Sequence, residues 1–399
     1  MIKDIKSVHF DHKCAANRNV LKPFDLENAE KVNKFHQSFQ QYKETPLVCL
    51  DGLAKALKLG KIFVKDESYR FGLNACKVLG GSYAIGNYIA KKYNLNPEEM
   101  TAEKMTSPEM KERLKDCCFV TATDGNHGRG IAWTAHELGV KSVIYMPKGS
   151  SEERLANIKA LGANASICDL NYDDCVRLAK ENAKKYGWIL VQDTAWPGYE
   201  EIPKWIMQGY TNMALEALRQ LDGIRPTHIF LQAGVGAMSG AVTAFFSSVF
   251  ENDKPIITIV EPNEADCIYQ TAKANDGNLH YVTGDLDSIM AGLCCGEPCT
   301  IAWDILKDYA DNFISVPDDI TKKGMRLLGS PTYGDSKIVS GESGAVGVGL
   351  LAELMENDAL KDLRTQIGLN ENSVVLCFST EGDTDKESYK DIVNLKSNL

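Results

Sequence analysis

Four short segments of the sequence carry residues whose types and spacing could do chemistry. The first is Lys65–Lys77, a mixed polar run that ends on a lysine and is followed by the apolar and small residues of Val78–Ser82. Burial of the Lys77 amine among them is expected to lower its pKa. A desolvated lysine near a helix start can form a Schiff base, and an ordinary surface cation is the alternative.

The second segment, Thr121–Gly130, is a small polar loop between a predicted strand and a helix that starts near His127. The first turn of a helix presents free backbone N–H groups, which can bind an anion of the size of a carboxylate. His127 can be a base in such a site or a structural histidine at the helix start. The Asp124-Gly125 pair by itself indicates only a turn.

The third segment, Leu231–Gly240, places glycines between a predicted strand and a helix. Glycines let the backbone approach a phosphate and bind it through N–H groups. Their spacing, G-x-G-x-x-x-G, is one residue off the dinucleotide-binding pattern, and no Gly-Lys-Ser/Thr of a P-loop follows. The spacing therefore favours a single phosphate over a pyrophosphate.

The fourth segment, Phe378–Asp385, follows the last apolar run and contains the neighbouring hydroxyls of Ser379 and Thr380. A hydroxyl there can hydrogen-bond to the nitrogen of a heterocycle, and an ordinary polar turn is the alternative. Each segment is a weak signal alone. Together they follow the strands at the edge where open α/β sheets bind ligands.

The elements that must position these segments alternate between about residues 45 and 380. Near-continuous apolar runs are typical of parallel strands covered on both faces, so the sequence predicts an α/β fold with largely parallel, doubly wound sheets. The predicted strands are Lys61–Glu67, Cys118–Asp124, Lys141–Pro147, Ala165–Asp169, Trp188–Thr194, Thr227–Gly234, Ile256–Glu261 and Ser373–Ser379. The clearest predicted helices are Asp173–Tyr186, Glu200–Leu221 and Ser343–Met355.

Two segments break this alternation. Pro97–Asp116 carries ten charged residues in twenty, with three methionines between them. A solvated connection is favoured there over an arm across an active site. Asp266–Pro298 is short of strand signals and rich in Gly, Asp and Cys, and we expect an irregular excursion from the main sheet.

Composition excludes several classes of function. The 399 residues include 44 Lys+Arg and 54 Asp+Glu, a net charge of −10 that argues against nucleic-acid binding. No apolar run approaches the roughly 18 residues needed to span a bilayer, and the first residues contain no apolar core of a secretory signal. We expect a cytoplasmic protein with no membrane and no nucleic-acid partner.

The twelve cysteines are scattered, several of them inside apolar runs, as free thiols of a reduced compartment would be. The one cluster consists of Cys294, Cys295 and Cys299. It lacks the C-x₂-C pairs and downstream histidines of a structural zinc site. We therefore expect no metal site.

Taken together, the four segments resemble the fold-type II, tryptophan synthase β-like enzymes that use pyridoxal 5′-phosphate, and Thr45-Pro46-Leu47 is similar to the opening of that family. Lys65–Lys77, Thr123–Gly130, Gln192–Trp196 and Ser379–Thr384 resemble, more narrowly, the branch that acts on 2,3-diaminopropionate. Sister dehydratases typically have Ser-Ser-Gly-Asn-His where this chain has Thr123–His127. The resemblance covers nearly the whole chain.

The resemblance implies a role for each matching residue. Lys77 would hold the cofactor as a Schiff base and Asn126 would hydrogen-bond its ring oxygen. The phosphate would be bound by the backbone of Gly234, Val235, Gly236, Ala237 and Met238. Gly125, Asn126 and His127 would bind the substrate carboxylate. Ser379 would face the pyridine nitrogen, with Thr380 as the alternative, and Glu342 would lie near the cofactor.

The reaction implied is α,β-elimination of 2,3-diaminopropionate to pyruvate and two ammonia. Lys77 would be the base for the L-enantiomer and Asp124 the base for the D-enantiomer, while Asp193 would recognise the β-amino group. The structural alternatives are a helix N-cap for Asp124 and a turn cap for Asp193. A threonine or serine dehydratase, or a non-catalytic module that binds the cofactor, are alternative functions.

The resemblance also implies two doubly wound lobes with the active site between them. A large cofactor-binding domain would be formed by residues 1–87 and 199–399. A small domain, residues 88–198, would include the charged insertion at about 97–116 and close over the site. We expect a small amino-acid substrate and a homodimer.

Overall fold

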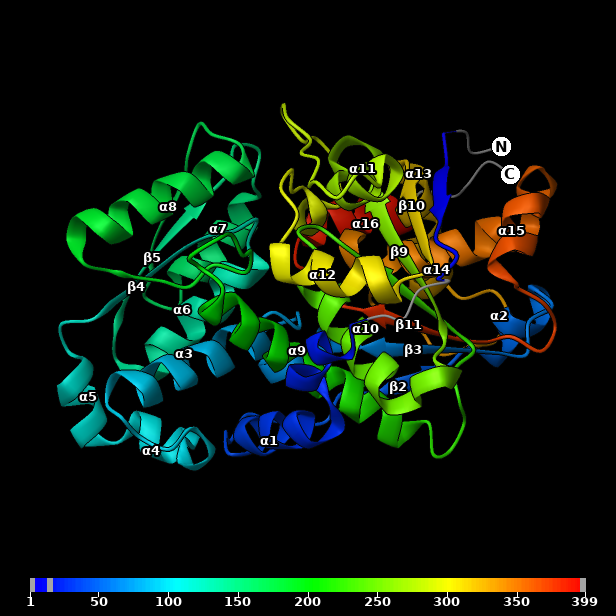
Figure 1. Ribbon diagram of the computed structural model, residues 1–399. Coiled ribbons are helices and arrows are strands. Elements are labelled where there is room, and N and C mark those ends of the chain that lie inside the picture. Colours follow the sequence, from blue (N-terminus) through cyan, green and yellow to red (C-terminus); the bar gives the residue numbers. More distant parts are fainter. Residues whose placement is uncertain (1–3, 13–16, 395–399) are drawn as a thin grey trace.

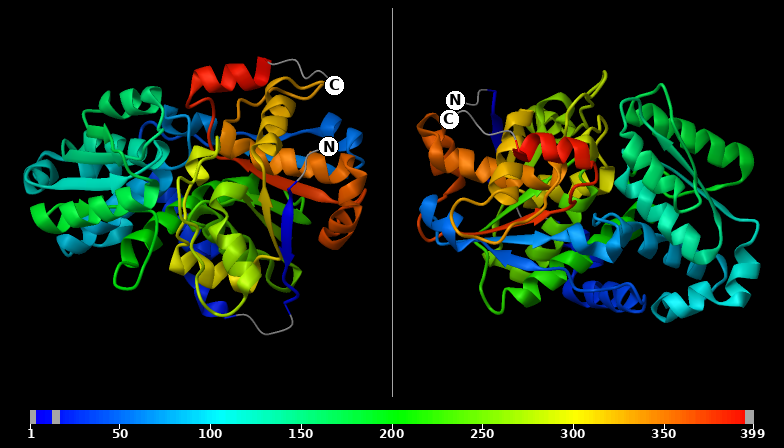
Figure 2. Two further views of the ribbon diagram at one scale, coloured as in Figure 1. Left: turned by 90° about the horizontal axis from the view of Figure 1, so that it is seen from above. Right: turned by 180° about the vertical axis from the view of Figure 1, so that it is seen from behind.

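The structure, a computed structural model, describes residues 4–12 and 17–394. Its centre is formed by two sheets, one of seven strands and one of four (Figure 1, Figure 2). We call the parts of the chain around them the seven-stranded lobe and the four-stranded lobe. The predicted α/β fold with largely parallel sheets is confirmed.

The seven-stranded sheet has the order β1-β10-β9-β8-β11-β3-β2. Its five inner strands are parallel, and the edge strands β1 and β2 pair antiparallel with their neighbours. The strands are β1 (Lys6–His9), β2 (Leu47–Cys49), β3 (Lys61–Asp66), β8 (His228–Gln232), β9 (Ile256–Pro262), β10 (Asn312–Val316) and β11 (Val374–Ser379).

The four-stranded sheet has the order β6-β5-β4-β7 and is entirely parallel. It is formed by one continuous part of the chain, which lies between β3 and β8 of the larger sheet. Its strands are β4 (Cys118–Ala122), β5 (Lys141–Met146), β6 (Asn164–Ile167) and β7 (Ile189–Leu190). In Figure 1 this lobe is the cyan and green half.

Helices cover both faces of each sheet (Figure 1). They are α1 (Leu26–Gln37), α2 (Asp51–Ala56), α3 (Val78–Lys92), α4 (Ala102–Thr106), α5 (Pro108–Leu114), α6 (Asn126–Leu138), α7 (Glu152–Lys159), α8 (Tyr172–Tyr186), α9 (Glu201–Gln220), α10 (Ala237–Phe250), α11 (Cys267–Ala274), α12 (Thr300–Tyr309), α13 (Asp318–Gly329), α14 (Glu342–Glu356), α15 (Lys361–Ile367) and α16 (Lys386–Asn394). Among the described residues, no helix is long and apolar enough to cross a membrane.

Each predicted strand overlaps a strand of the structure, but three of the strands in the described residues are missing from the prediction. Trp188–Thr194 keeps only the two residues of β7. The edge strands β1 and β2 are short and pair on one side only, so they lack a long apolar run. In β10, Asn312 and Ser315 interrupt the apolar residues although all five residues are buried, because their side chains hydrogen-bond inside the fold.

The charged insertion is packed, so its interpretation as a solvated connection is wrong. Residues 97–116 include α4 and α5, and Met100, Met105 and Met110 are at most 4% exposed. A Cβ built on Gly86 of α3 would lie 3.5 Å from the Met105 sulfur. The methionines form an apolar side that docks on the four-stranded lobe, while the charged residues mostly face solvent.

The stretch Asp266–Pro298 is irregular as predicted, apart from α11, which the sequence analysis missed. It leaves the seven-stranded sheet after β9 and returns through α12. The eleven cysteines that the structure describes are free thiols, as expected, and Cys14 lies outside the described residues.

Close contact with α9 fixes the position of α3, the helix that begins directly after Lys77. A Cβ built on Gly209 of α9 would lie 2.3 Å from the carbonyl oxygen of Leu79, and one on Gly80 would lie 2.7 Å from Ile206 Cγ2. Only glycine permits this approach of two backbones. The position of Lys77 is therefore set by helix packing.

A cluster of buried charges supports the segment that leads to Lys77. Glu216 of α9 accepts hydrogen bonds from Lys65 Nζ at 2.7 Å and from both terminal nitrogens of Arg70 at 2.8 Å. Arg70 also donates to Glu67, and none of the four side chains is more than 1% exposed. Buried charges persist only when they are paired in this way.

Replacing Glu216 with alanine leaves Lys65 and Arg70 buried without this carboxylate. We expect the free energy of unfolding to fall by about 3–5 kcal/mol. Glu201→Ala is the matched control, because Glu201 pairs with Lys91 at 2.5 Å on the surface, and its loss is expected to cost at most about 1 kcal/mol. Urea unfolding followed by circular dichroism measures both, and equal losses would contradict the role given to Glu216.

Candidate active site

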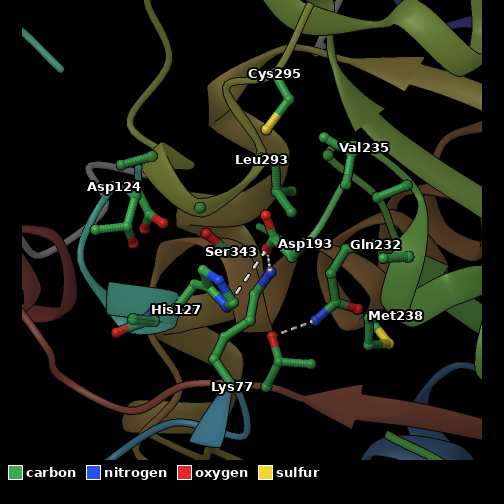
Figure 3. Close-up of a pocket in the computed structure, with 18 of the residues that line it drawn as sticks. Lys77, Asp124, His127, Asp193, Gln232, Val235, Met238, Leu293, Cys295 and Ser343 are labelled. Carbon is green, nitrogen blue, oxygen red and sulfur yellow. Dashed lines mark hydrogen bonds and ion pairs between the residues drawn. The ribbon is translucent and has the colours of Figure 1, made fainter. Parts of the chain in front are cut away.

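The four segments meet at one pocket, to which both sheets contribute the residues that follow their parallel strands (Figure 3). The predicted site residues that line the pocket are Lys77, Asp124, Asn126, His127, Asp193, Gly234, Val235, Gly236, Ala237, Met238 and Thr380. Gly125, Glu342 and Ser379 lie outside this lining.

Lys77 is the residue before α3, and its Nζ donates a hydrogen bond to Asp193 Oδ2 at 2.9 Å. Burial lowers the pKa of Lys77, but the Asp193 carboxylate and its other neighbours raise it by more, so this pKa lies well above its usual value. The expectation of a lowered pKa is therefore wrong for the chain by itself. Desolvation alone would lower this pKa, and the partner carboxylate of Asp193 reverses the direction of the shift.

Asp193 holds its charge in a buried position. Tyr172 and Gln192 donate to its second oxygen at 2.9 and 3.1 Å. Burial disfavours the charged form, yet the Lys77 ammonium and His127 hold the pKa of Asp193 well below its usual range. All three of these hydrogen bonds come from side chains, which does not match the alternative of a turn cap.

Asp124 lies in the β4–α6 loop, beside Gly125 at the start of α6. The Thr123 hydroxyl accepts the backbone N–H groups of Gly125 and Gly128, at 2.9 and 3.0 Å. Because Thr123 makes the cap, the N-cap alternative for Asp124 is wrong. The Asp124 carboxylate instead lies 3.7 Å from Arg154 Nη1, and burial raises its pKa.

The first two residues of α6 are anchored by their side chains. Asn126 Nδ2 donates to the Glu381 carboxylate, and His127 Nε2 donates to the carbonyl oxygen of Val191 at 2.8 Å. Since a carbonyl oxygen only accepts, Nε2 carries the proton. Burial lowers the pKa of His127, and the Asp193 carboxylate opposes this shift. This geometry favours the structural role for His127 over that of a base.

The glycine loop between β8 and α10 presents its backbone to the pocket. Gly236 has φ +92°, and a Cβ there would lie 2.7 Å from Ile268 Cδ1. A Cβ on Gly234 would lie 3.0 Å from the Cys295 sulfur. A side chain at either position would collide with these neighbours. The backbone N–H groups of the loop lie at the first turn of α10 and are suited to bind an anion.

At the end of β11, the hydroxyl that lines the pocket is that of Thr380. The Ser379 hydroxyl, on the last residue of the strand, donates to Ser340 at 2.8 Å. Gln232 Nε2 donates to Thr380 Oγ1 at 2.8 Å. Because the Thr380 oxygen accepts this bond, its own proton is available to an acceptor in the pocket.

Glu342 opens α14 outside the pocket lining. One of its oxygens accepts from the Ser388 hydroxyl at 2.5 Å, and the other lies 3.8 Å from Arg154 Nη2. The glutamate that lines the pocket is Glu381, which also accepts the backbone N–H of Ser343 at 2.8 Å.

Sequence reasoning missed Tyr172, Gln232 and Glu381 of the pocket lining, and Arg154, which lies next to it. Gln232 and Glu381 lie within or next to segments that were singled out, so the ends of β8 and β11 could have indicated them. Tyr172 and Arg154 come from α8 and α7, helices on which no motif falls, and only the tertiary structure brings them to the site.

Comparison with known proteins gives the class of this fold and site. A family model described as pyridoxal-phosphate dependent enzyme matches residues 39–371. The chain therefore belongs to the family of pyridoxal-phosphate dependent enzymes, and its fold is that of fold type II, as the motifs indicated.

Within this family the chain belongs with the diaminopropionate ammonia-lyases. It is 52% identical to that of Salmonella typhimurium over 367 residues, which is 91% of each chain, and 48% identical to that of Escherichia coli K12 over 372 residues, 93% of this chain and 92% of the relative. The crystal structure of the selenomethionine-labelled holo enzyme of Escherichia coli matches with a TM-score of 0.89 and 45% identity over 98% of each chain.

The residues of the pocket fit pyridoxal 5′-phosphate. The Lys77 amine would hold its aldehyde, the loop Gly234–Met238 would bind its phosphate, and the Thr380 hydroxyl would face its pyridine nitrogen, since all of them line the pocket. Gln232 Oε1 is a buried acceptor without a partner in the same pocket. Such an unsatisfied group indicates a ligand or water that completes its hydrogen bonds.

If the Thr380 hydroxyl bonds the pyridine nitrogen, Thr380→Ala removes one hydrogen bond to the cofactor. We expect the cofactor dissociation constant to rise by about three- to tenfold, with a shift in the visible absorption band. Ser379→Ala is the matched control, since it removes the neighbouring hydroxyl that bonds Ser340. A weaker cofactor complex in Ser379→Ala, with Thr380→Ala unchanged, would reverse the assignment.

Proposed function

We propose that this protein catalyses the α,β-elimination of 2,3-diaminopropionate, in which the substrate and one water give pyruvate and two ammonia. The observation that supports it best is the set of charges in the pocket. One amine, that of Lys77, shares the lining with three carboxylates, of which Asp193 and Glu381 are buried and Asp124 is partly buried. The Salmonella typhimurium relative, at 52% identity, is a diaminopropionate ammonia-lyase.

Pyridoxal 5′-phosphate, when bound, supplies the carbonyl that captures the substrate amine and the electron sink that acidifies its Cα. The Lys77 amine lies where it can hold the cofactor and then take the Cα proton of the L-enantiomer. Its hydrogen bond to Asp193 at 2.9 Å orients the amine. General bases must be positioned before their pKa matters, and this bond provides the position.

Asp124 is the base for the D-enantiomer in this proposal. Its carboxylate reaches the pocket from the β4–α6 loop, whereas Lys77 enters at the start of α3 (Figure 3). Burial raises the pKa of Asp124, which brings a carboxylate closer to the range useful for a base near neutral pH. A structure of the Escherichia coli relative was determined in complex with D-serine.

Asp193 would bind the β-ammonium of the substrate. Tyr172 and Gln192 keep its carboxylate in place by hydrogen bonds, and its charge stabilises a protonated amine, which leaves more readily than a neutral one. The backbone N–H groups of Asn126 and His127, in the first turn of α6, would bind the substrate carboxylate. The Asn126 side chain would hydrogen-bond the ring oxygen of the cofactor.

We place the small domain at residues 88–198, which contain the whole four-stranded sheet, and the large domain at residues 1–87 and 199–399. Closure of the small domain would exclude water from the pocket. A homodimer and a cytoplasmic location complete the proposal, on the resemblance described above.

The purified protein loaded with cofactor is expected to release pyruvate and ammonia in a ratio of one to two from 2,3-diaminopropionate. Coupled assays for each product measure this. Serine and threonine at equal concentration should react much more slowly. Faster turnover of serine or threonine would identify a dehydratase, and no turnover of any of the three would favour a module that only binds the cofactor.

Asp124→Asn keeps the size of the side chain and removes the base. We expect kcat for the D-enantiomer to fall by roughly 10²–10⁴-fold, as for loss of a general base, with the L-enantiomer affected far less. Steady-state assays with each enantiomer separately measure the difference. Equal losses on both enantiomers would refute a role confined to one face of the substrate.

A further inference from the structure

A buried arginine lies next to the pocket but outside its lining, on a helix that contains none of the sequence motifs. Arg154 of α7 is 6% exposed and is not part of the pocket lining. Its Nη1 lies 3.7 Å from Asp124 Oδ2, and its Nη2 lies 3.8 Å from Glu342 Oε2. One guanidinium is thus shared between the buried Glu342 carboxylate and the partly buried Asp124 carboxylate.

The two carboxylates belong to different lobes. Asp124 follows β4 of the four-stranded sheet, and Glu342 begins α14, which packs on strands β8 and β11 of the seven-stranded sheet. A second contact of α7 crosses the same boundary, because Glu153 accepts the backbone N–H of Lys386 at 3.0 Å. The helix α7 therefore joins the lobes next to Asp124.

Gly125 makes room for the arginine. A Cβ built there would lie 2.9 Å from Arg154 Cδ and 3.2 Å from its Cβ, and the backbone of Gly125 has φ +149°. The stem of Arg154 thus packs against the residue that adjoins Asp124 in the chain. Movement of this stem would displace the loop that carries the Asp124 carboxylate.

The ion pairs of Arg154 are not hydrogen bonds. Arg154 Nε, Asp124 Oδ2 and Glu342 Oε2 are all buried, and none of them has a hydrogen-bond partner among the described residues. At 3.7–3.8 Å, charge attraction acts without fixed direction, so the guanidinium can favour one carboxylate or the other as the lobes approach or separate. Buried polar groups left unpaired in a native fold indicate a functional constraint.

We propose that Arg154 is a positioning residue for the reaction, which holds the Asp124 carboxylate ionised and directed at the pocket when the lobes are together. It acts through Asp124 and touches neither substrate nor cofactor. The proposal rests on the proposed function, because it assigns Arg154 to the base that acts on the D-enantiomer.

The charges around Asp124 determine in which direction the loss of Arg154 would move the pKa of Asp124. The groups that face it from the neighbouring elements are Arg154 of α7, Lys77 before α3, Glu381 after β11 and Asp193 after β7. Burial raises the pKa of Asp124, Glu381 and Asp193 raise it further, and Arg154 and Lys77 lower it. Loss of Arg154 would therefore leave a base that ionises only at higher pH.

The test compares the pH dependence of kcat for the two enantiomers of 2,3-diaminopropionate. In Arg154→Gln, the acidic limb for the D-enantiomer is expected to move up by about one pH unit or more. Well below the pH of the original limb, this is about a tenfold loss, which recovers in more alkaline buffer. The limb for the L-enantiomer, with Lys77 as its base, is expected to stay in place and serves as the internal control.

Two further variants keep the test decisive if Arg154→Gln folds poorly. Arg154→Lys retains the cation and should restore the limb toward that of the original protein. Glu342→Gln removes the competing carboxylate, so the limb for the D-enantiomer should move to lower pH. The visible absorption of the bound cofactor and the melting temperature of each variant report cofactor loading and folding independently of activity.

The possible outcomes distinguish a failure of the proposed function from a failure of the role proposed for Arg154. If the unmodified enzyme acts on neither enantiomer, the proposed function is wrong. If it acts on both, and Arg154→Gln lowers the two rates equally or moves both limbs equally, Arg154 is only a structural residue. Opposite shifts in Arg154→Gln and Glu342→Gln, confined to the D-enantiomer, are the result that the proposal requires.

Discussion

The ion pair between the partly buried Lys77 and the buried Asp193 is the interaction around which the pocket is arranged. A charge withdrawn from water is tolerated only where hydrogen bonds replace its hydration, and Tyr172 and Gln192 provide these for the Asp193 carboxylate. The position of Lys77 is fixed by the close packing of α3 against α9 at their glycines, whereas Asp193 follows β7 of the other sheet. The pair therefore brings a strand end of the four-stranded lobe to the helix that leads away from β3.

Much of the site could be predicted from the sequence, because parallel strands place their carboxyl ends at one edge of a sheet. Segments that follow β4, β8 and β11 were far apart in the chain, yet the rule that brings strand ends together required them to meet. The glycine loop after β8 illustrates this, since both its position and its need for glycine follow from a strand, a tight turn and a helix start.

The rest depended on information that the local sequence does not contain. The direction of the Lys77 pKa shift is set by Asp193, a residue 116 positions away. The choice between Ser379 and Thr380 depends on where β11 ends, because neighbouring residues of a strand point to opposite faces. The methionines of the insertion looked isolated among charges, and only three-dimensional packing shows that short helices place them on one buried side.

Acidic groups distinguish this pocket from one suited to a hydroxyl-bearing amino acid. Asp124, Asp193 and Glu381 line it, while Lys77 is the one lysine or arginine among the lining residues. A second ammonium on the substrate compensates these charges, whereas a hydroxyl would leave them unbalanced in a buried site. The same crowding of carboxylates disfavours ionisation of Asp124, the group that must be ionised to act as a base. A cation is needed near it, and Arg154 supplies one from behind the pocket, where it takes no space from the substrate.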